Sequence, residues 1–143
     1  ADLLLAEIYL RNGRTREAET VARNAIARAP SGQAAAFLAD VIAAQGRIED
    51  ARAELAALDA VEPNAAMRAA IRAEFERRYG QGGDAETHYR AAAVEGGANA
   101  ALWRRYIAYV AARGRLADAA SLLEEARLAC PGDAGFIELA AKA

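Results

Sequence analysis

The residue types that build disulfides, metal sites and basic surfaces are scarce in this sequence. One Cys, Cys130, and one His, His88, are too few for an intramolecular disulfide framework or a cysteine-based zinc site. The formal net charge of -2 at pH 7 gives no reason to expect DNA as a partner, because non-specific nucleic-acid binding needs a basic surface. No apolar run reaches the roughly 18 residues of a membrane span, so we expect no direct membrane insertion. We also expect no cofactor and no bound metal.

Proline and aromatic residues are few as well. The chain has 3 Pro and 6% aromatic residues, and most of its 55% hydrophobic residues are alanine. Alanine is the best helix former, because it loses no side-chain entropy in a helix. Strands are not indicated, since no run alternates apolar and polar residues. The composition therefore predicts an all-α fold whose helices approach closely and whose core layers are thin.

The first residues of the chain already follow a helical pattern. Residues 1–6 carry no secretory signal and no initiator Met, and we interpret the chain as a fragment or processed segment of a larger protein. A single Cys fits a reducing compartment, which favours the cytoplasm. The periplasm is the alternative if the segment comes from an exported parent.

A short pattern recurs along the chain: a Gly, an Ala five residues later and a Pro seventeen residues after the Gly. Its copies are Gly13, Ala18 and Pro30; Gly46, Ala51 and Pro63; and Gly114, Ala119 and Pro131. Gly80 and Ala85 begin a further copy, with Gly97 in place of the Pro. The Gly positions are 33, 34 and 34 residues apart, which is typical of a stacked repeat.

Each copy predicts a pair of helices joined at the Gly and ended at the Pro. The units are residues 1–30, 31–63, 64–97 and 98–131, followed by a final helix over 133–143. We expect Thr15, Ser31 and Asp84 to cap helix N-termini. The turn after Tyr79 is expected to be about one residue longer than the others.

Two stretches carry a fuller pattern. In the first unit it is Leu5, Ala6, Tyr9, Gly13, Ala18, Ala22, Ala25 and Pro30. In the fourth it is Trp103, Tyr106, Val110, Gly114, Ala119, Leu123, Ala126 and Pro131. Both resemble the tetratricopeptide repeat (TPR) family, although Arg72 of the third unit falls where a small residue is usual. The resemblance implies one solenoid domain, a right-handed α-α superhelix of about four helix-turn-helix repeats plus a final helix.

The resemblance also implies a function. In TPR proteins the first helices line a concave groove that binds protein or peptide segments, so we expect a non-catalytic interaction scaffold. The matching groove positions are Leu3, Glu7, Leu10, Arg11, Gln33, Asp40, Glu76, Arg77, Arg104 and Ala108, with Ala69 and Ala73 added for the third unit. Glu7 and Asp40 stand where carboxylate-binding TPR modules have Asn. We therefore predict a partner helix or an extended apolar segment rather than a C-terminal carboxylate.

Two alternatives stay open beside this prediction. Residues 102–106, followed by Cys130 and Pro131, resemble the half-a-TPR repeats of RNA-processing scaffolds. A TPR segment of a bacterial envelope or polysaccharide-export assembly is the other alternative. The acidic isoelectric point and the first two units favour an ordinary TPR. Exposed repeat ends would also allow self-association.

For some local motifs we prefer a structural role to a catalytic or ligand-binding one. Gly80-x-Gly82-x-x-Ala85 matches a degenerate dinucleotide fingerprint, but that motif needs a preceding strand and a helix is expected here. Asp84 lies one turn before His88 and could interact with it on a helix surface, but we interpret His88 as an ordinary helix residue rather than an acid–base catalyst. Trp103 and Tyr106 are interpreted as core residues rather than a platform for stacking bases.

Overall fold

The computed structural model describes residues 2–80, 83–133 and 135, and this part of the chain contains helices and no strand. The helices are α1 (Asp2–Arg11), α2 (Thr15–Arg28), α3 (Gly32–Ala44), α4 (Ile48–Leu55), α5 (Leu58–Val61), α6 (Ala65–Tyr79), α7 (Gly83–Gly96), α8 (Ala100–Ala112) and α9 (Leu116–Ala129). The prediction of an all-α helical repeat is confirmed. The handedness of the superhelix stays a prediction, and the final helix predicted over 133–143 lies outside the described residues except for 133 and 135.

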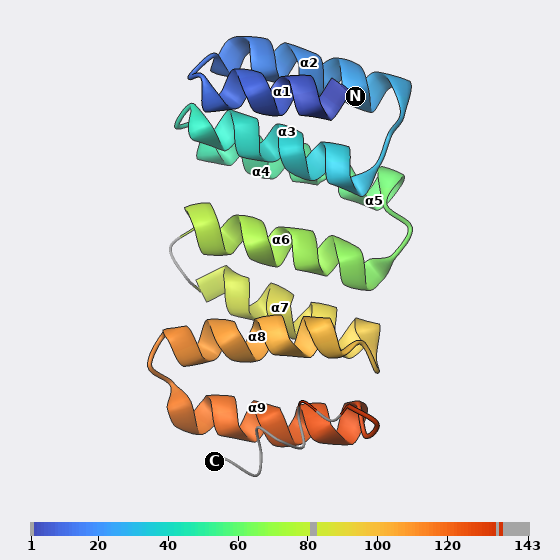
Figure 1. Ribbon diagram of the computed structural model, residues 1–143, viewed down its shortest axis with the longest axis vertical. Coiled ribbons are helices and arrows are strands. Elements are labelled where there is room, and N and C mark those ends of the chain that lie inside the picture. The colour runs from blue at the N-terminus through green and yellow to red at the C-terminus, as the bar shows by residue number, and fades with distance from the viewer. Residues whose placement is uncertain (1, 81–82, 134, 136–143) are drawn as a thin grey trace.

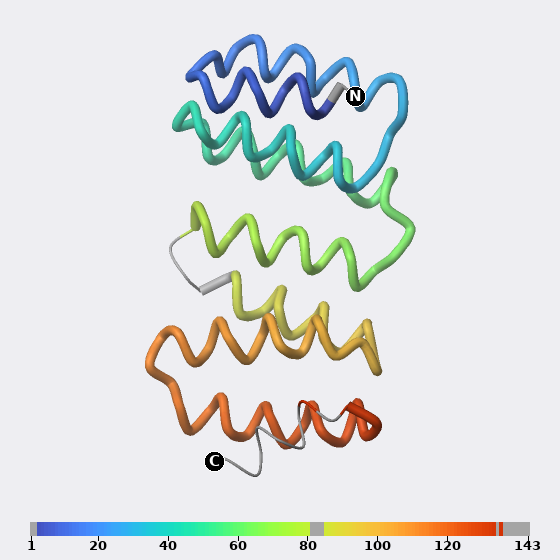
Figure 2. Tube along the Cα trace, in the orientation of Figure 1, coloured from blue at the N-terminus to red at the C-terminus, as the bar shows by residue number. Residues whose placement is uncertain are grey.

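The helices lie across the long axis of the molecule, and the helix pairs follow one another along it in chain order (Figures 1 and 2). Helices α1 and α2 are at one end and α9 is at the other (Figure 1). Consecutive helices pack on one another, α1 on α2, α2 on α3, α3 on α4, and α6 to α9 in turn. Each pair therefore buries its apolar side against its neighbours, as in other solenoids.

In three of the four units, a glycine in the left-handed conformation ends the first helix. Gly13, Gly46 and Gly114 have φ of 74°, 82° and 79°, and the helix before each ends two residues earlier. The third unit differs, because α6 continues to Tyr79 and Gly80 has an extended φ of -84° and ψ of 175°. Three residues separate α6 from α7, as in the other units, so the longer turn that was expected is not found. The rest of the turn, residues 81 and 82, lies outside the description.

The predicted caps have different outcomes. Ser31 caps α3, because its hydroxyl oxygen accepts a hydrogen bond from the Ala34 amide at 3.1 Å. The prediction for Thr15 was wrong: Arg14 occupies the N-cap position of α2 without a side-chain hydrogen bond, and Thr15 is the first helical residue. Helix α2 starts immediately after the glycine turn, one residue earlier than the cap prediction assumed. The side chain of Asp84 lies outside the description.

The second helix of the second unit is divided into α4 and α5. The amides of Ala56 and Ala57 donate to carbonyl oxygens three residues earlier, at 3.2 and 3.1 Å, so one turn is tightened to the 3₁₀ form. Leu55 and Leu58 are both buried as a result, on the two sides of this turn. Periodicity alone had predicted a single helix here.

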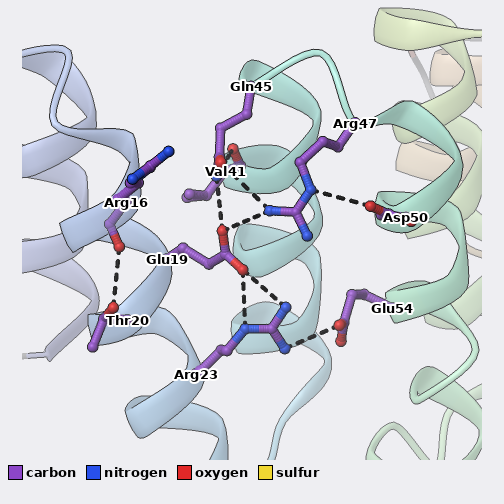
Figure 3. Close-up of polar contacts among 9 residues, drawn as sticks. All are labelled: Arg16, Glu19, Thr20, Arg23, Val41, Gln45, Arg47, Asp50 and Glu54. Atoms are coloured by element: carbon purple, nitrogen blue, oxygen red, sulfur yellow. Dashed lines mark hydrogen bonds and ion pairs between the residues drawn. The ribbon is translucent and has the colours of Figure 1, made fainter.

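Glu19 joins the first helix pair to the second (Figure 3). Its carboxylate accepts hydrogen bonds from Gln45 at 2.9 Å and from Arg47 at 3.0 Å, both in the turn between α3 and α4. Arg23, on the same helix as Glu19, donates to its other oxygen at 2.9 Å and also reaches Glu54 of α4 at 3.0 Å. This carboxylate therefore fixes how α2 lies on the second unit.

The junction between the second and third units is more polar. Arg52 of α4 donates to Glu76 of α6 at 2.7 Å, and Arg78 of α6 donates to Asp40 of α3 at 3.0 Å. Phe75 is the buried apolar residue of α6 that joins the core of α3 and α4. A separate cluster joins α6 to α7, α8 and α9, and a smaller one lies between α6, α7 and α8. The apolar interior is therefore divided near the middle of the stack.

Candidate functional site

Three adjoining hollows lie along the first helices of the units. The first, of about 420 Å³, is formed by α1 and α3, and the second, of about 200 Å³, lies mainly between α3 and α6. They share Ala36 and Asp40. The third hollow, of about 600 Å³, is formed mainly by α6 and α8 and shares Glu74 and Arg105 with the second. We call this series the groove.

Most of the predicted site residues line the groove. Leu3, Glu7, Gln33 and Asp40 line the first hollow, and Glu76, Arg77 and Ala108 line the third. Leu10, Arg11 and Arg104 lie outside these three hollows. Arg11 forms an ion pair with Glu7 at 2.7 Å, and Arg104 forms one with Asp133 at 2.7 Å. The structure therefore brings the predicted residues together in two groups, one at each end of the groove.

Glu76 is the most enclosed of these residues. Its side chain is buried, and its two carboxylate oxygens accept hydrogen bonds from Arg52 at 2.7 and 3.1 Å. Ala69 and Ala73, which were also predicted for the third unit, are buried. Glu76 still borders the third hollow, and on α6 the groove is also lined by Met67, Ala70 and Glu74.

Glu74 was not among the residues predicted for the third unit. It lies six residues before Gly80, and Glu7, Asp40 and Ala108 lie six residues before their own turn glycines. Counting back from Gly80 would have found it. Arg105 and Arg113 were also missed; they border the largest hollow, and neither residue is at a family groove position that we had matched.

The charges that line the groove are largely paired with one another. Glu74 accepts hydrogen bonds from the Tyr89 hydroxyl at 2.7 Å and from Arg77 at 2.8 Å. Burial opposes the charged form of Glu74, but these hydrogen bonds and the positive charges of Arg77 and Arg105 lower its pKa. Burial, then the hydrogen bond to Glu74, raises the pKa of Tyr89 to about 12. The carboxylate stays ionised and the phenol stays protonated at neutral pH.

A comparison with protein families identifies part of the chain. A family model described as tetratricopeptide repeat matches residues 10–74. This segment is made of tetratricopeptide repeats. TPRs generally mediate protein–protein interactions, and the family is typically a non-catalytic scaffold. No match was found among curated proteins.

The matched segment runs from the end of α1 into α6, and it includes part of the lining of each of the first two hollows, with Ala36 and Asp40 in both. The family resemblance found in the sequence is thereby confirmed. The half-a-TPR interpretation stays a side alternative. The helix pairs α6–α7 and α8–α9 continue the helical repeat beyond the matched residues.

The aromatic residues of the last TPR-like unit belong to its core. Trp103, Tyr106 and Tyr109 are buried, and the Trp103 indole donates to the Gly97 carbonyl oxygen at 3.1 Å. Their buried faces leave no platform for stacked bases at these three residues. The interpretation of Trp103 and Tyr106 as core residues is confirmed.

The remaining reactive groups of the described residues are dispersed. His88 is half-buried beside Arg72 and Glu76 in a hollow of about 250 Å³. Cys130 is buried, and this burial raises the pKa of its thiol. In the part of the chain that the structure describes, no three His, Cys, Asp or Glu side chains are grouped as a metal site requires. Within the same residues, no helix is both long and apolar enough to cross a membrane.

Proposed function

We propose that this chain is a non-catalytic interaction scaffold whose groove binds a helix or an extended apolar segment of a partner protein. The observation that supports this most directly is the continuity of the three hollows along α1, α3, α6 and α8, through the residues that adjoining hollows share. An isolated pocket would suit a small molecule, whereas a continuous groove suits a chain segment.

The lining of the groove favours apolar contacts. Small side chains such as Ala36, Ala108 and Ala112 let a bound backbone approach closely, and Phe37 offers a larger apolar surface. Glu7, Asp40 and Glu74 are each paired with an arginine, so their charge is mostly satisfied before a partner arrives. Binding energy would then come mainly from buried apolar area, with polar contacts at the rim.

Arg105 and Arg113 are suited to the rim contacts. Both border the largest hollow, and the Arg113 guanidinium lies 5.5 Å from the centre of the Tyr109 ring. A polar or acidic residue at one end of the bound segment would fix its direction along the groove. The main affinity is still expected from apolar residues. The partner segment is either part of another protein or another part of the parent chain.

Peptide display followed by fluorescence anisotropy tests this proposal. Displayed peptides are selected on the intact chain, and the best binders are titrated against Ala108→Trp, in which the indole fills the largest hollow. We expect at least about tenfold weaker binding, since tenfold corresponds to about 1.4 kcal/mol. The matched control is Ala120→Trp on the exposed side of α9, for which no loss is expected.

Two results would contradict the proposed mode of binding. One is equal affinity of the selected peptides for Ala108→Trp and for the unchanged chain. The other is tight, salt-sensitive binding of an acidic C-terminal peptide, because it would mean that carboxylate recognition dominates.

A further inference from the structure

The outer face of α1 carries apolar side chains that no helix covers among the described residues. Leu5 is 44% exposed and Ile8 is 46% exposed. Leu5 precedes the turn glycine of its unit by eight residues and Ile8 by five, so each has a counterpart in the other first helices. In α3 the counterparts are Leu38 and Val41, which are 2% and 0% exposed.

The same two positions are buried in α8, where Tyr106 and Tyr109 are 3% and 7% exposed. The covering helix in both cases is the second helix of the preceding unit, since α2 packs on α3 and α7 packs on α8. Each covering helix contributes a small side chain to the core that it shares with the covered helix, Ala22 from α2 and Ala85 from α7. The exposed positions of α1 thus match positions that a second helix buries elsewhere in this chain.

An arginine directly after the turn glycine holds the covering helix at both of these junctions. Arg47 donates to Glu19 of α2 at 3.0 Å and to Asp50, three residues after it, at 3.1 Å. Arg115 donates to Glu86 of α7 at 2.6 and 3.1 Å. Each covering helix therefore supplies one glutamate, and this glutamate lies six residues after the turn glycine that precedes the covering helix.

Arg14 holds the same position in the first unit. Its backbone φ and ψ are -91° and 66°, against -92° and 63° at Arg47 and -86° and 66° at Arg115. Arg14 makes the local ion pair with Glu17, three residues after it, and its guanidinium lies 5.0 Å from the centre of the Tyr9 ring. Within the described part of the chain, no carboxylate from a covering helix pairs with it.

We propose that this face of α1, with Leu5, Ile8 and Arg14, binds the second helix of another repeat of the same type, one that has a glutamate six residues after its turn glycine. Burial of the aliphatic side chains would supply affinity, and the charge-assisted hydrogen bonds would fix the register. A second copy of this chain added end to end does not meet the requirement, because Ala120 stands six residues after Gly114. This surface is separate from the groove.

An extended chain tests the proposal with a helix that the protein already contains. Residues 64–101 are copied in front of residue 1, so that the copied Gly80 precedes Gly13 by 34 residues, the spacing between Gly80 and Gly114. The copied Glu86 is then in register with Arg14. We expect the backbone amides of α1 to exchange with solvent at least about ten times more slowly than in the original chain.

Two substitutions in the extended chain show whether the docking is specific. The copied Glu86→Gln and Arg14→Ala should each lower the urea midpoint, and the double variant should lower it no further than the larger single effect. Arg14→Ala in the original chain is the matched control and should have a much smaller effect. Unchanged amide exchange in α1, or fully additive losses, would overturn the proposal.

Sedimentation equilibrium of the original chain tests the alternative that a second copy of this chain covers the α1 face. We expect a monomer. A dimer that dissociates on Leu5→Glu substitution would mean that a second copy covers this face, and it would overturn the choice of a glutamate-bearing repeat.

Discussion

At the scale of single residues, a few enclosed glutamates determine how helices of different units lie on one another. Glu19 accepts hydrogen bonds from Gln45, Arg47 and Arg23, so one carboxylate satisfies donors from two units. An isolated surface ion pair contributes about 0–1 kcal/mol, because solvent screens it and two long side chains must be ordered. A partly enclosed carboxylate with several donors is worth more, since its loss leaves those donors without an acceptor.

Replacing Glu19 with Ala is expected to lower the free energy of unfolding by about 1–3 kcal/mol, because Arg47 and Gln45 lose their common acceptor. Urea denaturation followed by circular dichroism measures the change. Glu49→Ala is the control, since Glu49 is highly exposed and pairs with Arg52 within the same helix. Equal losses in the two variants would mean that Glu19 has no special role at the junction.

The acid sensitivity of the chain should also depend on Glu19. Its pKa lies below the ordinary 4.5, chiefly because Gln45 donates to it; together with Arg23 and Arg47, this hydrogen bond outweighs the burial that would raise the pKa. A lowered folded-state pKa stabilises the fold above the unfolded pKa, and the stabilisation is lost as pH falls through the folded value. We therefore expect Tm to fall more steeply between about pH 5 and about pH 3 in the unchanged chain than in Glu19→Gln. Parallel curves from differential scanning calorimetry would contradict this assignment.

At the scale of the elements, short turns determine where each helix ends and how it meets its partner. Gly46 has a φ of 82°, and an added Cβ there would meet no heavy atom within 4 Å. Any cost of a side chain at this position therefore comes from the backbone conformation alone. The division between α4 and α5 has a different origin, because it lies in an alanine-rich stretch without Gly or Pro.

Gly46→Ala is expected to lower the free energy of unfolding by about 1–2 kcal/mol, because an L-residue is strained in the left-handed region. Thermal denaturation measures the loss. Gly132→Ala is the matched control, since Gly132 also has open space around it but has no positive φ. A loss of the same size at Gly132 would indicate that backbone handedness is not the cause.

At the scale of the whole molecule, the apolar interior is divided into clusters that meet at α6. The first core lies in α2 to α5, and the other clusters join α6 to α7, α8 and α9. Phe75 is the buried aromatic residue that α6 contributes to the first core, and the ion pairs Arg52–Glu76 and Arg78–Asp40 also join α6 to the second unit. In a linear repeat the coupling between neighbouring units sets how cooperatively the whole unfolds.

Phe75→Ala is expected to cost about 3–5 kcal/mol, because it removes the large apolar contact at the junction. The two halves should then unfold separately, so that amides of α3 and α8 no longer share one global exchange rate in native-state hydrogen exchange. Met67→Ala is the control on the same helix, since Met67 is exposed. One cooperative transition in Phe75→Ala would show that the ion pairs are sufficient to couple the halves.

Much of the fold was predictable because its signals are local. Glycines at turns, prolines after second helices and the cap at Ser31 act on the backbone beside them, so position along the chain is enough to place helix ends. The residues expected along the groove on the first two units came from the family resemblance, and Glu7 and Asp40 lie at the same distance from their turn glycines. The sequence by itself thus determined the helical repeat and one end of the groove.

Only the tertiary structure decided which residues face each other across units. Glu76 borders the third hollow, but its carboxylate is buried and held by Arg52 from another helix pair, whereas Glu74, which was not predicted, lines two of the hollows. The tightened turn between α4 and α5 likewise keeps Leu58 buried, and nothing in the local sequence marks it. These outcomes depend on the charge and volume of side chains distant in sequence, because burial and pairing are satisfied only when the helices are packed together.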